Sequence, residues 1–202
     1  MIKQLYNRLM SYLIGQAECP HGVLGRFITL IWTVYFKKLS LWTLSHTVLE
    51  DHSKVLEIGY GGGATIKRLV AYQKKLKIYG IDPSYNAYQR TLKNNKKAIK
   101  SKEVKLSIGK VEDLTYETMS FDTVFAIQTH IFWSNLSQGI SEIYRVIRDG
   151  GQLIISCEIS KIAYHQGQYA DPSIFIELLE TIGFKKVTVL KTPMWVYYCA
   201  LK

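Results

Sequence analysis

The sequence predicts an α/β fold, with a seven-stranded, mostly parallel sheet, a reversed last strand and helices on both faces. From residue 54 onward, short β-branched runs alternate with longer amphipathic runs, which is typical of repeated βα units. Near the end of the chain, only Lys191-Thr192-Pro193 separates two strand-like runs, so these strands are expected to form an antiparallel hairpin. The predicted strands lie near 54–59, 77–81, 104–108, 121–127, 151–158, 184–190 and 194–201, and the predicted helices lie near 63–74, 84–99, 136–147 and 171–182.

The first 50 residues contain two helical patterns, separated by a turn-rich break at 15–22. We expect an N-terminal helical cap over 1–50 and a single globular unit over 51–202. The longest apolar run, 27–36, is well short of the roughly 20 residues needed to cross a bilayer, so it predicts a buried or interfacial helix. His21 and Tyr35 in this region are candidate residues of a lid.

The composition indicates a globular protein and gives no sign of disulfides or of a metal site. A chain of 202 residues with 48% hydrophobic content can bury a full core. Cys19, Cys157 and Cys199 are odd in number and widely spaced, which argues against a disulfide framework and a metal site. A reducing, cytoplasmic location fits this cysteine usage, and the N-terminus shows no export signal.

The formal net charge of +10 is compatible with a nucleic acid or an anionic membrane as partner. The basic residues concentrate around the predicted helix 84–99 and its exit, where Lys93, Lys97 and Lys100 follow helical spacing. Aromatic side chains that could stack on bases are absent between Thr91 and Val111. A solvated helix face is therefore the favoured interpretation, and nucleic acid is a possible but not favoured partner.

A glycine-rich turn follows the first predicted strand directly. Residues 55–63 read Val-Leu-Glu-Ile-Gly-Tyr-Gly-Gly-Gly, and such glycines let a ligand approach the N-terminus of the next helix. The second strand ends in Asp82, about 20 residues further on, where a ribose-binding acid is expected. Together, the glycine turn and Asp82 predict a nucleoside cofactor. Because Gly59-x-Gly61-x-x-Ala64 also fits the dinucleotide pattern, the turn alone leaves NAD open.

The order of the motifs along the chain resembles the class I S-adenosylmethionine-dependent methyltransferases, in particular small bacterial members with a type 11-like domain. The segments that carry the resemblance are Glu57-x-Gly59-x-Gly61-x-Gly63, Gly80–Ser84, Gly109–Leu114, Phe121–Phe125, and the helix that is expected to stop at Asp149-Gly150-Gly151 before a buried strand. Gly22-x-x-Gly25-Arg26 also resembles the segment that precedes the domain in small bacterial members. The resemblance implies a Rossmann-like sheet and S-adenosyl-L-methionine as cofactor.

The resemblance also implies roles for individual residues. The backbone at Gly59, Gly61 and Gly63 is expected to pass under the methionine and sugar, and Asp82 to accept hydrogen bonds from the ribose. Glu57 is expected to hold the loop and to engage the ammonium end of the methionine indirectly, and its alternative role is a cap or salt bridge within the fold. The remaining expected cofactor-binding residues are Tyr60, Pro83, Val111, Glu112 and Gln128. Lys110 departs from the family pattern, since an ammonium cannot accept a bond from the adenine amine.

The methyl acceptor is expected beyond the carboxyl ends of the fourth and fifth strands. His130 is the candidate catalytic base, with a pKa expected near neutrality, and its alternative role is that of a packing residue. The expected substrate pocket consists of Thr129, Phe132, Trp133, Tyr164 and His165.

The sequence that follows the fourth strand argues against two classes of acceptor. Ala126-Ile127-Gln128-Thr129 stands where amino-methylating relatives carry an Asn/Asp-Pro-Pro-aromatic tetrapeptide, and the site lacks the Pro-Cys pair expected for pyrimidine C5 methylation. The sequence therefore favours methyl transfer to a small-molecule acceptor by in-line displacement. An RNA- or lipid-directed enzyme of the same fold, a non-catalytic S-adenosylmethionine-binding protein and an NAD-dependent oxidoreductase remain as alternatives.

Overall fold

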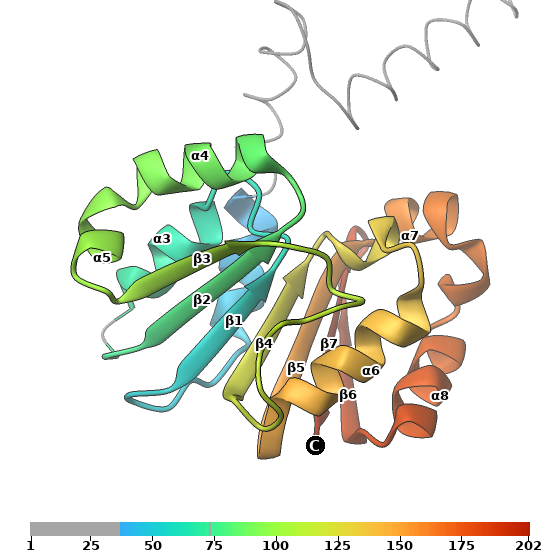
Figure 1. Ribbon diagram of the computed structural model, residues 1–202. Coiled ribbons are helices and arrows are strands. Elements are labelled where there is room, and N and C mark those ends of the chain that lie inside the picture. Colours follow the sequence, from blue (N-terminus) through green and yellow to red (C-terminus); the bar gives the residue numbers. More distant parts are fainter. Residues whose placement is uncertain (1–36, 73) are drawn as a thin grey trace, which may run out of the picture. The chain divides into compact units, whose positions relative to one another are not determined.

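The computed structural model describes residues 37–72 and 74–202 (Figure 1). Trp42–Lys202 forms one compact unit, while Met1–Leu41 is assigned to another. The cap predicted over 1–50 stays a prediction. Its first helical pattern, its turn-rich break, its apolar run and the lid residues His21 and Tyr35 lie outside the described residues, whereas the described part of its second pattern is helical over 37–45.

The unit is built on a seven-stranded sheet of order β3-β2-β1-β4-β5-β7-β6. β1 to β5 are parallel, and β7 is antiparallel to both β5 and β6. This arrangement confirms the predicted sheet and its reversed last strand. The strands are β1 (Lys54–Ile58), β2 (Lys77–Asp82), β3 (Val104–Ile108), β4 (Phe121–Ile127), β5 (Ile147–Glu158), β6 (Lys185–Lys191) and β7 (Trp195–Leu201).

Helices cover both faces of the sheet, because successive strand residues point to opposite sides. In β1, Leu56 and Ile58 belong to the hydrophobic cluster that includes residues of α6 and α8, whereas Val55 belongs to the cluster that includes residues of α3 and α5. After a helical segment over 37–45, the helices are α3 (Ala64–Val70), α4 (Tyr85–Asn94), α5 (Lys96–Lys100), α6 (Leu136–Val146), α7 (Ile159–His165) and α8 (Pro172–Ile182), with single 3-10 turns η1 (His130–Phe132) and η2 (Gly167–Tyr169). No helix among the described residues is long and apolar enough to cross a membrane.

The helix predicted over 84–99 is two helices, α4 and α5. Asn95 between them has φ −120° and ψ 23°, outside the helical region. Its buried side-chain amide donates to the carbonyl oxygens of Gly63 and Thr91, at 3.2 Å each. The break therefore comes from a tertiary contact with the glycine turn, which helical periodicity does not reveal.

The helix predicted to stop at Asp149-Gly150-Gly151 ends earlier, at Val146. Ile147 already pairs with Phe121 of β4, so sheet hydrogen bonding replaces helix before the glycines are reached. Gly150, with φ 72°, serves instead as an irregular position within the long strand β5. The glycine signal thus marks an irregularity in the pairing of a strand and not the end of a helix.

Candidate active site

The glycine turn lies at the carboxyl edge of the sheet, between β1 and α3. Gly59, Gly61 and Gly63 have φ values of 71°, 50° and 72°, which other residues rarely adopt. A Cβ at Gly59 would meet Thr129 Cγ2 at 2.5 Å, and one at Gly63 would meet Thr91 Cγ2 at 2.5 Å. A Cβ at Gly61 would have no atom within 4 Å. The turn is therefore packed at both ends and open at Gly61.

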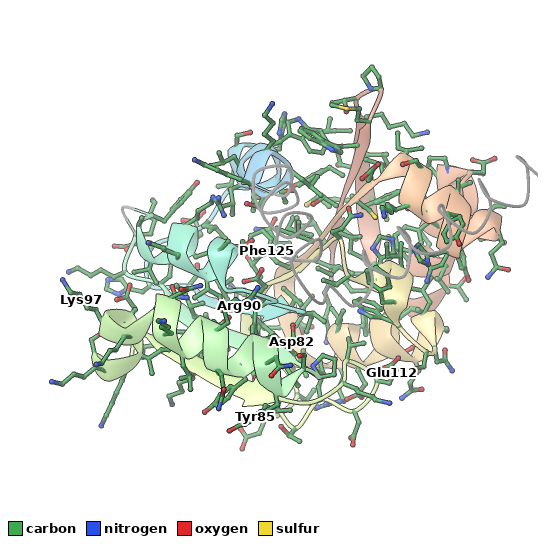
Figure 2. All side chains as sticks on the ribbon, turned by 90° about the horizontal axis from the view of Figure 1, so that it is seen from above. Asp82, Tyr85, Arg90, Lys97, Glu112 and Phe125 are labelled. Carbon is green, nitrogen blue, oxygen red and sulfur yellow. The ribbon has the colours of Figure 1, made fainter. Side chains whose placement is uncertain are left out.

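Asp82 ends β2 beside this turn and is 7% exposed (Figure 2). Its Oδ2 accepts a hydrogen bond from Gly61 N at 2.8 Å, and its Oδ1 accepts one from Ser84 N at 2.9 Å. Each carboxylate oxygen retains capacity for a further bond. Asp82 thus fixes the open part of the turn and stays available as an acceptor for hydroxyl groups.

Side chains of α4 and of Asn95 hold the turn from its carbonyl side. Thr91 Oγ1 donates to Gly61 O at 2.9 Å, Asn94 Nδ2 donates to Gly62 O at 2.9 Å, and Asn95 Nδ2 donates to Gly63 O. Three consecutive carbonyl groups are thereby turned toward α4. Sequence reasoning missed these residues, although Ser and Thr, Asn and Asp are the side chains most often used to bond backbone groups of turns.

Glu57 lies in β1 just before the turn and is 3% exposed. Burial raises the pKa of its carboxyl group to about 8, against a smaller opposing effect of a hydrogen bond with Thr65. Its Oε2 has no hydrogen-bond partner among the described residues. A buried, unpartnered carboxyl oxygen is costly, and a positively charged group beside it would satisfy it.

Three other predicted cofactor-binding residues have structural contacts in this fold. The buried Tyr60 side chain donates to Ser107 O on β3 at 3.0 Å, so it fastens the turn to the sheet. Val111 is part of the core. Glu112 Oε1 accepts bonds from the backbone N–H groups of Ser134 and Asn135, at 2.7 and 3.2 Å, before α6 begins.

The fourth, Pro83, is exposed between Asp82 and the Ser84 N-cap of α4. Its role in the site and those of Tyr60, Val111 and Glu112 stay predictions. For these residues, any contact with the cofactor would come from the backbone or from atoms not already bonded.

Gln128 follows β4 with φ 59°, an uncommon conformation for a residue with a side chain. Its backbone N–H donates to Ser156 O, and its Oε1 accepts from Glu158 N, both at 2.8 Å. Its Nε2, in a side chain only 7% exposed, has no acceptor among the described residues. Gln128 thus joins the ends of β4 and β5 and keeps one unpaired donor.

His130 does not have the near-neutral pKa that its position suggested. The residue is 1% exposed, and burial lowers the pKa of its imidazole to about 3. The ring packs against Phe175 and Trp133, with centroid distances of 5.6 and 6.2 Å. Its neutral form is therefore stable at physiological pH and is a weak proton acceptor, so the geometry fits the alternative role in packing.

The expected pocket residues divide into two groups. Phe132, Tyr164 and His165 form an aromatic trio, in which His165 contacts Phe132 at 5.0 Å and Tyr164 at 4.8 Å between centroids. Phe132 and Tyr164 are exposed at the carboxyl ends of β4 and β5. Trp133 instead packs on buried His130, and Thr129 lies under Gly59 and donates to Ile58 O at 3.3 Å. The pocket role of all five residues stays a prediction.

The described residues contain no group of three or more His, Cys, Asp or Glu side chains that could hold a metal ion. What they bring together at one edge is an open glycine turn, a buried acceptor on each side of it and an exposed aromatic trio beyond. Such an edge can hold a nucleoside that carries a positive charge and place an apolar molecule next to it.

Comparison with known proteins agrees with this arrangement. Residues 56–155 match the family model described as a methyltransferase domain. The uncharacterised methyltransferase YdaC of Bacillus subtilis is 27% identical over 120 residues, which cover 59% of this chain and 64% of YdaC. A 2-methyl-6-phytyl-1,4-hydroquinone methyltransferase of Oryza sativa is 25% identical over 150 residues, which cover 70% of this chain and 44% of that protein. The chain thus matches less than two thirds of either relative's length.

A solved structure of a putative S-adenosylmethionine-dependent methyltransferase from Methanococcus maripaludis shares the fold. It superposes with a TM-score of 0.71 at 17% identity and covers 88% of this chain and 92% of that one. The sheet order, the glycine turn with its two acids and the family match lead to one conclusion: this chain belongs to the class I S-adenosylmethionine-dependent methyltransferases, with the methyltransferase domain of the type 11 family.

Proposed function

We propose that the protein transfers a methyl group from S-adenosylmethionine to a small-molecule acceptor at the carboxyl ends of β4 and β5. The observation that carries this proposal is the buried, unpartnered Oε2 of Glu57 beside a turn that is open at Gly61. A ligand with both an ammonium group and a ribose fits these two sites. The hydroquinone methyltransferase among the relatives supports a small acceptor.

The residues have separable tasks in this proposal. Glu57 would hold the ammonium group, and Asp82 would hold the ribose hydroxyls. Gly61 would leave room for the cofactor to lie against the turn. When bound, S-adenosylmethionine supplies a methyl group on a positively charged sulfur, which is already activated toward displacement. The protein then contributes orientation and the exclusion of water, and correct orientation alone is worth several kcal/mol.

The aromatic trio would hold the acceptor. Phe132 and Tyr164 present exposed rings at the edge where the parallel strands end, which is where ligands of open α/β sheets bind. His130 is not assigned the role of base, because its buried imidazole has a pKa of about 3.

A cytoplasmic location remains the prediction, supported by the free thiols of Cys157 and Cys199.

The test is methyl transfer from S-adenosylmethionine with a labelled methyl group to panels of phenols and hydroquinones, amines and thiols. With an acceptor identified, Phe132→Ala and Tyr164→Ala should each lower kcat/KM by about tenfold through weaker acceptor binding. Met119→Ala is the matched control, since Met119 is similarly exposed but lies before β4, at the opposite edge. Labelling of RNA or of lipid in preference to every small molecule would support the alternative acceptors, and cofactor binding without transfer to any of them would support a non-catalytic role.

A further inference from the structure

The outer side of α4 and α5 is strongly basic. Between Pro83 and Lys102 the chain has no acidic residue. The basic side chains of this segment are exposed and are here named the α4–α5 basic face: Arg90, Lys93, Lys96, Lys97, Lys100 and Lys102. The two helices lie over the β3 edge of the sheet (Figure 1), with Lys97 at their outer end and Arg90 nearer Asp82 (Figure 2).

These charges are not neutralised within the described part of the chain. The ion pairs found there join His52 with Asp51, Arg145 with Glu142, and Arg148 with Asp122, and none includes a residue of the basic face. Like charges so close together repel one another, and an anionic partner would relieve that repulsion. The face is thus complementary to a surface that carries many negative charges.

Large apolar side chains are exposed at the adjoining carboxyl edge of the sheet. Tyr85 begins α4 and Ile108 ends β3, next to the basic face, and they are 60% and 49% exposed. Both residues lie at the end of the basic face where α4 begins and β3 ends, so this face has apolar side chains beside its charges.

We propose that the α4–α5 basic face docks the protein on the surface of an anionic lipid bilayer, with Tyr85 at one end of this face entering the lipid interface. Clusters of four to eight basic residues are typical of binding to anionic lipids, and tyrosine and other apolar side chains suit the interface between water and lipid. Five of the six residues of the face are lysines, whereas phosphate recognition in nucleic acids favours arginine.

The positions of the aromatic residues also favour a lipid surface over a nucleic acid as the partner. Tyr85 and Tyr88 stack on each other at the start of α4, with 6.3 Å between centroids, and no aromatic residue follows until after β3. A nucleic-acid groove would instead place rings among the basic residues. The proposal concerns a surface and does not depend on the proposed methyl transfer.

The test is sedimentation of the full chain with vesicles of phosphatidylcholine, with or without phosphatidylglycerol. The expected result is binding only to the anionic vesicles, with release in 0.5 M salt, which shortens the Debye length to about 4 Å. The triple variant Lys93→Gln, Lys97→Gln, Lys100→Gln should bind about a hundredfold more weakly, since each basic residue near an anionic membrane strengthens binding by about fivefold.

Lys185→Gln, Lys186→Gln, Lys191→Gln is the matched control. It removes the same charge from exposed positions of β6, at the opposite end of the sheet, and it should keep near-native binding. Unchanged melting temperature and cofactor affinity would show that both variants are folded. Equal loss in the two variants, absence of vesicle binding, or tighter binding to single-stranded RNA than to vesicles would each overturn the proposal.

Discussion

Glu57 illustrates how burial changes the chemistry of a residue that sequence alone can place. The motif located this acid next to the glycine turn, but nothing in the motif reveals that the residue is only 3% exposed or that burial raises the pKa of its carboxyl group to about 8. At pH 7 the carboxyl group is therefore mostly protonated in the free protein. Its ionised form becomes favourable once a cation lies beside it.

This linkage makes cofactor binding depend on pH. Binding a cationic ammonium ionises Glu57 and releases a proton, so the affinity for S-adenosylmethionine should rise from pH 6 to pH 7.5, by at most about tenfold per unit. Calorimetry across this range measures the effect, and Glu57→Gln should bind more weakly with a nearly flat profile. A wild-type profile that is equally flat would contradict the role of Glu57.

The raised pKa of Glu57 also determines how the free energy of unfolding of the free protein should depend on pH. The pKa of Glu57 is raised in the folded state to about 8 from 4.5, so the folded protein binds more protons between these values. The stability that Glu57 contributes is then full at low pH and is lost as the pH rises through the folded pKa. Urea unfolding at pH 6 and pH 8 should show this decline in the wild type and a smaller one in Glu57→Gln, where equal declines would point to other groups.

The glycines of the turn differ in what a methyl group would do. At Gly61 an added Cβ meets no atom, so Gly61→Ala should cost only about 1–2 kcal/mol of stability from the left-handed conformation. The methyl group would still occupy the space over the turn, and cofactor affinity should fall at least tenfold.

Gly63→Ala is the comparison at a residue with a similar φ. Its Cβ would lie 2.5 Å from Thr91 Cγ2 and 2.7 Å from Asn95 Nδ2, so this variant should lose more stability than Gly61→Ala. Melting temperature and cofactor affinity separate the two effects. Undiminished cofactor binding by Gly61→Ala would show that the open side of the turn is not where the cofactor lies.

At the scale of elements, the extent of each helix depends on contacts that local pattern does not contain. Helix α4 was predictable from its amphipathic run, yet its end at Asn94 follows from the bonds that Asn95 makes to the glycine turn. Similarly, α6 ends at Val146 because Ile147 pairs with Phe121. The start of β1 and the hairpin of β6 and β7 were predicted well, because turn residues and strand pattern agree there.

The contacts between α4 and the turn give a prediction at this scale. Thr91→Val keeps the shape of a fully buried side chain but leaves Gly61 O without its donor, so S-adenosylmethionine affinity should fall by about fivefold. Thr47→Val is the matched control: Thr47 is also buried and donates to a backbone oxygen, that of Thr43, away from the turn. Both variants should lose stability, and only Thr91→Val should lose affinity. Equal affinities would mean that α4 does not position the turn.

For the whole molecule, the sequence predicted the seven-stranded, mostly parallel sheet, its reversed last strand and the carboxyl edge at which the site is expected. It could not show which of the predicted site residues are already bonded within the fold. Tyr60 and Glu112 were predicted from the family motifs, but their polar atoms hold β3 and the start of α6. His130 was predicted from its position after β4, whereas its burial depends on Phe175 from a distant helix.

The glycine turn and Asp82 are expected to hold S-adenosylmethionine. Calorimetry with S-adenosylmethionine, S-adenosylhomocysteine and NAD tests this expectation in the wild type, in Asp82→Asn and in the control Asp149→Asn, whose aspartate is exposed at the start of β5, away from the glycine turn. We expect micromolar binding of the first two ligands, no binding of NAD, and at least tenfold weaker binding in Asp82→Asn alone. Preference for NAD, or equal affinities in wild type and Asp82→Asn, would contradict the account.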